Sequence, residues 1–240
     1  SLHLAVCLPL YVCLIPRNGQ PEGPAREPAR ESTAPASGDA TLATALRTRA
    51  FWGLAIWFTA QSITFSGVTF QLIPFLTDQA VKTEHILLTA ALIGPMQVLG
   101  RLVLMVLFSR QVGTPTVGKI ISLTQAVALF MLLQAPKSLP WLLLFAVLYG
   151  TTNGATTILR GTAVAELLGR SHFGAIAGAL TVPSSLARAF APVVLAAIWS
   201  AADSETMLTA MVLNALVGLV GMLLTRPRQS VLARGATSGL

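Results

Sequence analysis

Two arginines, Arg101 and Arg188, lie inside long apolar runs of the sequence. If each run is a membrane helix, their guanidinium groups lie ~22 Å and ~16 Å from the same membrane face at 1.5 Å per residue, which is near mid-membrane. Holding a cation there costs at least about 2.5–3.5 kcal/mol, so it normally faces a cavity or a partner. No Asp or Glu lies within these runs. An anionic ligand is therefore one expected partner.

A carboxylate suits a guanidinium group because the planar fork donates two parallel hydrogen bonds to it. Three other ways of compensating the charges stay open: an acid elsewhere in the protein, backbone carbonyls with water, or, for Arg101, a side chain that extends to the membrane surface. The leading hypothesis is the anionic ligand, which assigns both arginines to substrate binding.

Uncharged polar residues in the apolar runs are further candidates for substrate binding. Tyr149, Asn153 and Thr156 recur at i, i+4 and i+7, which places them on one stripe of a helix. Gln61 could line the same passage, and Gln97 lies one turn before Arg101. The alternative for each is a hydrogen bond between neighbouring helices, which is common in membrane bundles.

Residues suited to catalysis or metal binding are few. An enzyme needs a nucleophile with a base, or a cluster of metal ligands. The histidines are His3, His85 and His172, and only His3 lies in an apolar run, without an acid beside it. Cys7 and Cys13 fit neither a disulfide framework nor a zinc site. We therefore expect no catalytic residues, no metal and no cofactor.

The elements that carry these residues are predicted to be membrane helices. Hydrophobic residues make up 54% of the 240 positions, charged residues only 10%, and the mean hydropathy is +0.71, whereas soluble domains carry about 25% charged residues. A span needs about 20 apolar residues. Six runs qualify: Ala50–Leu76, Ile86–Ser109, Thr116–Ala135, Leu139–Leu159, Phe173–Trp199 and Thr206–Thr225. Membrane strands would instead show short alternating segments.

The remaining segments flank this six-helix bundle, predicted over residues 50–225. Residues 1–16 are expected to be the end of a preceding membrane helix, because Ser1 opens directly onto an apolar stretch. Residues 17–49 are rich in Pro, Ala, Glu and Ser and are predicted to be a disordered linker. Residues 226–240 form a polar tail. A long linker before six closely connected helices indicates the second of two bundles.

The basic residues predict the orientation. With the linker placed in the cytoplasm, only Lys82 and Lys137 fall on the opposite side. The cytoplasmic side receives twelve cations: Arg17, Arg26, Arg30, Arg47, Arg49, Arg110, Lys119, Arg160, Arg170, Arg226, Arg228 and Arg234. This asymmetry follows the positive-inside rule and accounts for the net charge of +7 without nucleic acid. The linker and the tail are thus predicted to be cytoplasmic.

The six spans show a faint internal repeat. Spans that begin near residues 51 and 139 are 88 residues apart, and Ala91-Leu92-x-x-Pro95 through Arg101 matches Ala179-Leu180-x-x-Pro183 through Arg188. Each unit holds three spans, so the second unit is inverted relative to the first. Inverted three-plus-three repeats build many secondary transporters.

The chain resembles the C-terminal half of major facilitator superfamily transporters, and among them the bacterial monocarboxylate and oxalate/formate-type members. Three segments carry the likeness: FWGLAIWFTAQSITFSGVTFQLIPFLTDQ to the seventh helix, GPMQVLGRL to the eighth, and ELLGRSHFGAIAGAL to the loop into the eleventh. The resemblance implies that Arg101 contacts a substrate carboxylate and that Arg188 supplies a second cation. Several relatives carry an acid where this chain has Gln97, so the likeness does not extend to proton coupling here.

The sequence therefore predicts an all-α membrane protein that is one half of a twelve-helix secondary transporter. Its substrate would be a small organic anion, such as a monocarboxylate, moved by alternating access in a bacterial inner membrane. Its partners would be the lipid bilayer and an N-terminal half-bundle of the same protein. Export of drug-like compounds, a membrane enzyme and a non-transporting subunit remain as alternatives. Substrate identity, direction, coupling ion and oligomeric state are not predicted.

Overall fold

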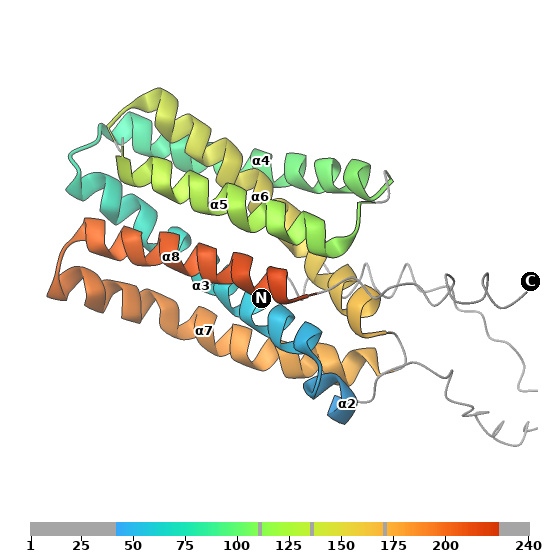
Figure 1. Cartoon of the computed structure of the whole chain (residues 1–240). Coiled ribbons are helices and arrows are strands. Elements are labelled where there is room, and N and C mark those ends of the chain that lie inside the picture. The colour runs from blue at the N-terminus through green and yellow to red at the C-terminus, as the bar shows by residue number, and fades with distance from the viewer. Residues whose placement is uncertain (1–41, 110–111, 135–136, 170–171, 226–240) are drawn as a thin grey trace, which may run out of the picture. The chain divides into compact units, whose positions relative to one another are not determined.

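The computed structural model describes residues 42–109, 112–134, 137–169 and 172–225. The partial span predicted over residues 1–16, most of the predicted linker and the tail lie outside the described residues. Within them the chain is helical and contains no strand, as predicted. The helices are α2 (Leu42–Leu46), α3 (Arg49–Asp78), α4 (Thr83–Ser109), α5 (Thr114–Gln134), α6 (Leu139–Leu168), α7 (Phe173–Ala201) and α8 (Ser204–Leu224). The six long helices form a bundle (Figure 1).

Five of the six long helices, α4 to α8, are both long enough and apolar enough to cross a membrane. Helix α3 has 30 residues but is less apolar, because buried polar side chains such as Gln61, Ser62, Thr64 and Ser66 occupy its length. These side chains do not face lipid. The polar content of α3 is therefore accommodated inside the bundle.

Helical structure begins before the predicted boundary at residue 50. Ala45 of the short helix α2 is fully buried, and the Thr48 hydroxyl donates to its carbonyl at 2.7 Å. Thr48 also accepts the Phe51 amide at 3.2 Å, which caps α3. The indole of Trp52 donates to the Leu46 carbonyl at 2.9 Å. The end of the predicted disordered linker is thus held in place by the start of α3.

Helix α6 continues to Leu168, beyond the predicted end at Leu159. Ala163, Val164 and Leu167 of this extension are buried, so the helix keeps an apolar face after Arg160. Glu166, expected in a loop, is instead part of α6, and its carboxylate accepts hydrogen bonds from the amide and hydroxyl of Thr114 at the start of α5. An acid at a helix N-terminus satisfies free amides and complements the helix dipole.

The helices pack as the predicted inverted repeat requires. Helix α3, the first of its triplet, packs chiefly against α7 and α8, the second and third of the other triplet. Helix α6 packs in the same way against α4 and α5, and α5 packs against α8. Exchanging the two triplets therefore leaves these main packing pairs unchanged. In Figure 1, α4, α5 and α6 lie on one side and α3, α7 and α8 on the other.

Glycines bring α4 and α6 into direct contact. A Cβ atom added to Gly154 would lie 1.9 Å from the Gln97 carbonyl oxygen, and one on Gly100 would lie 2.0 Å from the Thr151 oxygen. Gly150 and Gly154, four residues apart on α6, thus allow the close approach that small residues give to membrane-helix interfaces. The same spacing of Gly174 and Gly178 has no such role here, since a Cβ atom at either position meets nothing within 4 Å.

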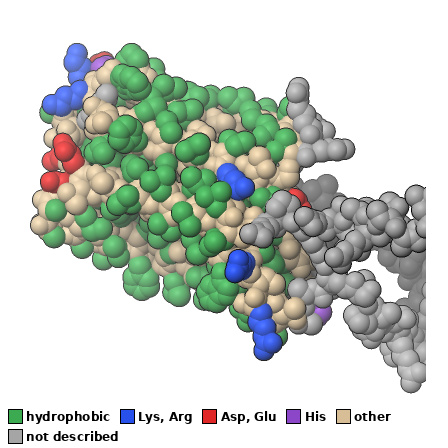
Figure 2. All heavy atoms as spheres, viewed as in Figure 1, with side chains coloured by type: hydrophobic (Ala, Val, Ile, Leu, Met, Phe, Trp, Pro, Cys, Tyr) green, Lys and Arg blue, Asp and Glu red, His purple; other side chains and the backbone are tan. Residues whose placement is uncertain are grey.

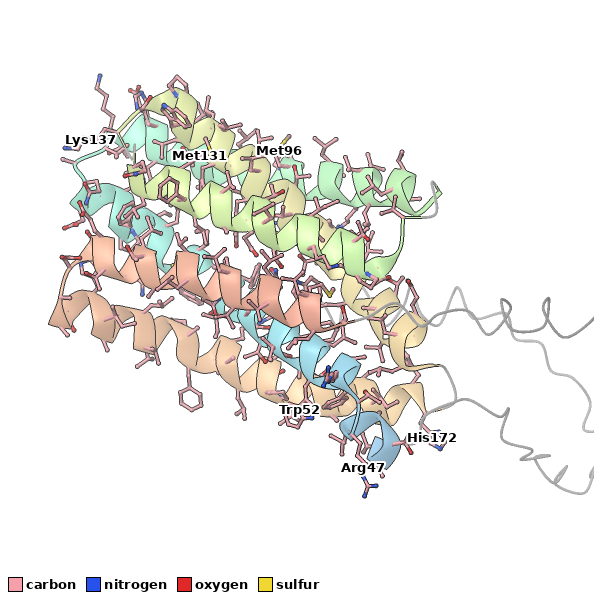
Figure 3. All side chains as sticks on the ribbon, viewed as in Figure 1. Arg47, Trp52, Met96, Met131, Lys137 and His172 are labelled. Atoms are coloured by element: carbon pink, nitrogen blue, oxygen red, sulfur yellow. The ribbon has the colours of Figure 1, made fainter. Side chains whose placement is uncertain are left out.

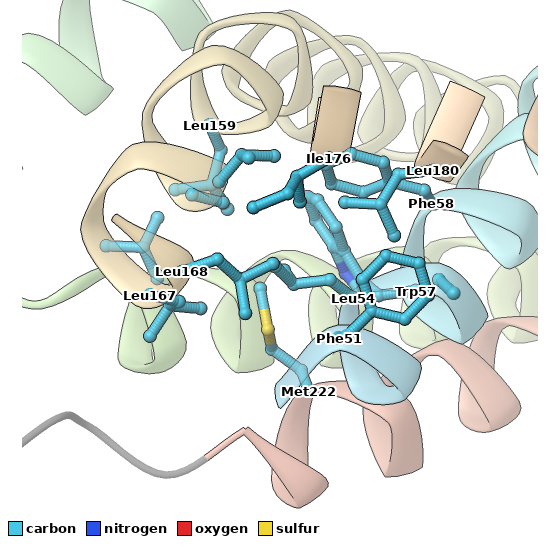
Figure 4. Packing of buried hydrophobic residues seen from close by; sticks show 14 of the residues in the cluster. Phe51, Leu54, Trp57, Phe58, Leu159, Leu167, Leu168, Ile176, Leu180 and Met222 are labelled. Carbon is cyan, nitrogen blue, oxygen red and sulfur yellow. The ribbon is translucent and has the colours of Figure 1, made fainter. Parts of the chain in front are cut away.

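The interior holds large apolar side chains around Trp57 (Figure 4). Trp57 is fully buried, and its indole donates to the Ser122 hydroxyl at 2.9 Å, which joins α3 to α5. Phe51 and Leu54 of α3 pack with Ile176 of α7 in the same cluster. Helix α3 is thus held on several sides.

The face shown in Figure 2 carries many hydrophobic side chains, and exposed large hydrophobic residues occur on all six long helices. Helices α4 and α7 are the least buried of α4 to α8: only 11% and 17% of the residues in their apolar segments lie inside the bundle. Arg47 and His172 lie at one end of the molecule and Lys137 at the opposite end (Figure 3). An apolar surface between polar ends is what a bilayer requires, and the chain is an integral membrane protein.

Candidate functional site

A cavity of about 350 Å³ opens between α3, α6 and α7. Its volume lies in the range of small-molecule sites, which are concave and hold a few fixed polar groups. Polar and aromatic side chains from all three helices line it: Phe58 and Ser62 of α3, Arg160 of α6, and Thr181, Ser184, Ser185 and Arg188 of α7. We call it the arginine cavity.

Arg160 is held firmly in this cavity. Its Nη2 donates to the Phe58 carbonyl at 2.7 Å and to the Ser62 hydroxyl at 2.6 Å. Its guanidinium carbon lies 5.1 Å from the centre of the Phe58 ring, within cation–π distance. Its Nε is buried and has no hydrogen-bond partner. The contacts on α3 therefore fix the position of this charge.

Arg188 is held by its backbone and leaves its guanidinium group free. The Arg188 carbonyl has no helical partner, because Pro192, four residues later, lacks an amide hydrogen. It instead accepts a hydrogen bond from the Ser66 hydroxyl of α3 at 2.8 Å. The Arg188 guanidinium carbon lies 5.1 Å from the centre of the Phe65 ring. No hydrogen bond links this guanidinium group to another described residue. It is exposed and available to a ligand.

The charge in the cavity is unbalanced. The Arg160 and Arg188 charges lie close enough to repel one another, and no acidic residue is among the described residues that line the cavity. Hydroxyl groups of Ser62, Ser184 and Ser185 border the same space. Such a site is expected to attract anions, because two neighbouring cations without a nearby acid produce a positive potential in the cavity.

The predicted site residues fall into three groups, and only Arg188 lines the arginine cavity. Gln61, Tyr149 and Asn153 are buried inside the bundle at 4%, 2% and 7% exposure. Tyr149 stacks on Phe145, with ring centres 5.5 Å apart. Its hydroxyl group has no hydrogen-bond partner. Substrate contact by these three residues stays a prediction.

Arg101 and Gln97 lie on α4, away from the arginine cavity. Arg101 is exposed and Gln97 is half-exposed. The 88-residue repeat offset pairs Arg188 with Gly100, not with Arg101. A shift of one residue turns a side chain by about 100° around a helix, so Arg101 faces a different direction from Arg188. Its role in substrate binding also stays a prediction.

The sequence pattern assigned Arg160 to a cytoplasmic flank, but the structure places it in α6 and in the cavity. The apolar run pauses at Arg160, Gly161 and Thr162, and this pause led to the predicted end of the span at Leu159. The missed signal is the return of apolar residues at Ala163, Val164 and Leu167, which continues the helical period.

Groups of three or more residues able to hold a metal ion are absent from the described part of the chain. The chemistry available in the cavity is therefore that of cations, hydroxyls and aromatic rings. Groups of this kind are able to bind and orient an anion.

Comparison with known proteins places the chain in a family. No curated protein matches the sequence. The sequence profile of the Major Facilitator Superfamily matches residues 2–192, which is most of the chain. With its bundle of long apolar helices built as an inverted repeat, the chain belongs to the Major Facilitator Superfamily, a family of membrane transporters.

Proposed function

We propose that this chain is the C-terminal half of a secondary transporter that moves a small organic anion by alternating access. The observation that most strongly supports an anionic substrate is the composition of the arginine cavity. Arg160 and Arg188 line it, and no carboxylate is among its described lining residues. Arg188 would bind the substrate carboxylate with its free guanidinium fork. Arg160, whose position is fixed by its contacts on α3, would add a second positive charge.

Alternating access needs a second bundle to move against this one. The weakly buried faces of α4 and α7 are the surfaces on which we expect the N-terminal half to pack. Arg101 and Gln97 on α4 would then face the passage between the halves and could contact the substrate from there. This arrangement keeps the predicted role of Arg101 while separating it from the arginine cavity.

The finer assignments rest on the sequence. The resemblance to monocarboxylate and oxalate/formate-type members favours a carboxylate substrate and a bacterial inner membrane. The uneven distribution of cations favours a cytoplasmic linker and C-terminus. Arg47 and His172 would then lie at the cytoplasmic end and Lys137 at the outer end (Figure 3).

Uptake by the transporter that contains this chain, reconstituted in proteoliposomes, tests the proposal. Radiolabelled acetate, butyrate and succinate are offered to the wild type and to Arg188→Gln. Losing a charge-assisted hydrogen bond costs about 1.5–3 kcal/mol, so we expect substrate affinity to fall at least about tenfold. Arg47→Gln, which removes an exposed arginine just after α2, is the matched control and should transport normally.

Two results would contradict the proposal. Carboxylate uptake that is unchanged in Arg188→Gln would show that the cavity does not bind the substrate. Transport of uncharged or cationic drug-like compounds with no carboxylate uptake would support the export alternative, in which the arginines are structural.

A further inference from the structure

A monocarboxylate would use only one of the two guanidinium groups in the arginine cavity. Resting on the proposed anion transport, we infer that the cavity binds an organic dianion with two separated carboxylates, one at Arg188 and one at Arg160. Two cations with no acid among the described lining residues are neutralised by two negative charges. A single carboxylate would leave one of the cations uncompensated.

The spacing of the two charges sets the shape of the ligand. Phe58 and Phe65 are seven residues apart on one face of α3, which separates their rings by ~10 Å along the helix. Each ring carries one guanidinium group at 5.1 Å, so the charges follow one another along α3. Oxalate, whose carboxylates are joined directly, is too short to present a full carboxylate edge to each group. A dicarboxylate with a spacer, such as succinate or glutarate, reaches both.

The two arginines differ in freedom, and this fits two different tasks. Both hydrogen bonds from Arg160 leave through Nη2, so Nη1 is the group that remains for a ligand. The side chain cannot swing away, since Phe58 and Ser62 hold it. The Arg188 guanidinium group has only the Phe65 ring beneath it and can adjust its position. Arg160 therefore sets where the second carboxylate must lie, and Arg188 accommodates the first.

The hydroxyl groups support this arrangement. Ser184 and Ser185 border the cavity on α7, one turn before Arg188, and Thr181 lies one further turn away. The Ser184 hydroxyl donates to the Thr181 carbonyl at 2.9 Å, whereas Ser185 is exposed. Ser185 is thus placed to donate to a bound carboxylate oxygen.

Binding of matched ligands to the purified transporter tests the inference by titration calorimetry. Succinate and glutarate are compared with butyrate, which has one carboxylate on a chain of similar length, and with oxalate. We expect succinate or glutarate to bind at least about tenfold tighter than butyrate, because a second charge-assisted contact forms. In Arg160→Gln this preference should disappear, so that succinate, glutarate and butyrate bind with similar affinities.

The wild-type comparison decides the matter even if Arg160→Gln does not fold. Butyrate or oxalate binding as tightly as succinate and glutarate would overturn the dianion inference, as would a preference that persists in Arg160→Gln. If carboxylates bind in an Arg188-dependent manner without that preference, only this inference fails. Absence of binding by every carboxylate would overturn the proposed function as well.

Discussion

The two repeat-related interfaces of the bundle are built in opposite ways. At the α4–α6 interface, Gly100, Gly150 and Gly154 bring the backbones together. At the α3–α7 interface, the position equivalent to Gly100 is Arg188, and a cavity of about 350 Å³ lies beside it. The same packing scheme thus gives a closed contact where the residue is glycine and a charged opening where it is arginine.

The two interfaces are therefore expected to contribute differently to stability and to substrate binding. The closed interface depends on backbone proximity, and the cavity of about 290 Å³ beside it has no charged residue among its described lining. The open interface is held by hydrogen bonds from Ser66 to the Arg188 carbonyl and from Gln71 to the Pro192 carbonyl, at 2.8 Å and 3.2 Å. Substitutions at the first should change folding, and substitutions at the second should change both substrate binding and stability.

The largest effect is expected from Gly154→Ala at the closed interface. Its Cβ atom would lie 1.9 Å from the Gln97 carbonyl oxygen, and backbone atoms cannot move aside cheaply. We expect a loss of at least about 3 kcal/mol, at the upper end of overpacking costs. The thermal unfolding temperature in detergent measures it.

Gly174→Ala is the matched control for this substitution. A Cβ atom there meets nothing within 4 Å, so the change should be neutral or stabilise by up to roughly 0.5–1 kcal/mol through the lower flexibility of alanine. Equal unfolding temperatures for the two variants would show that the glycines of the closed interface are not needed for packing.

A smaller effect is expected from Ser66→Ala at the open interface. The Arg188 carbonyl, already without its helical partner because of Pro192, would lose the hydrogen bond that replaces it. An unpaired buried carbonyl costs about 1–3 kcal/mol, and this partly buried one should cost about 1 kcal/mol, at the lower end. The unfolding temperature should fall and carboxylate affinity should weaken, because α7 carries Arg188. Ser200→Ala, at an exposed serine near the end of α7, should change neither.

The smallest effect is expected outside both interfaces, at Asp203. Its carboxylate caps α8 by accepting the Thr206 amide at 2.5 Å, and this backbone hydrogen bond lowers the pKa of Asp203 below its ordinary value. A lowered pKa contributes stability above the unfolded value, and that stability is lost as pH falls through the folded value. The difference in unfolding temperature between wild type and Asp203→Asn should therefore shrink below about pH 4. A difference that grows on acidification would contradict this sign.

Much of the fold could be predicted because a continuous apolar run of about 20 residues is typical of a membrane helix. The predicted spans for α4 and α7 agree with the structure to within a few residues. The end of α6 was missed because the apolar run pauses at Arg160, although the helical period resumes at Ala163. Helix α2 could not be placed, because Ala45 is ordered by packing against residues distant in the sequence. Hydropathy along the chain does not contain those contacts.

The candidate site was predictable only in part for the same reason. Arg188 stood out because it interrupts an apolar run, whereas Arg160 lies where such a run pauses. The partners that place Arg160 in the cavity, Phe58 and Ser62, are about a hundred positions away on α3. Arg101 also interrupts an apolar run. Its position in the repeat is one residue beyond that of Arg188, so its side chain leaves α4 in a different direction from that in which Arg188 leaves α7.

The reactivity of a cysteine in the arginine cavity tests the central claim most directly. Ser185→Cys, in a transporter without Cys7 and Cys13, is treated with anionic and with cationic methanethiosulfonate reagents of similar size. Ser200→Cys, also on α7, corrects for the intrinsic reactivity of the reagents. We predict that the anionic reagent reacts at least about tenfold faster at Ser185→Cys, because fixed charges concentrate counter-ions in a cleft. Equal rates, or a faster cationic reagent, would contradict an anion-attracting cavity.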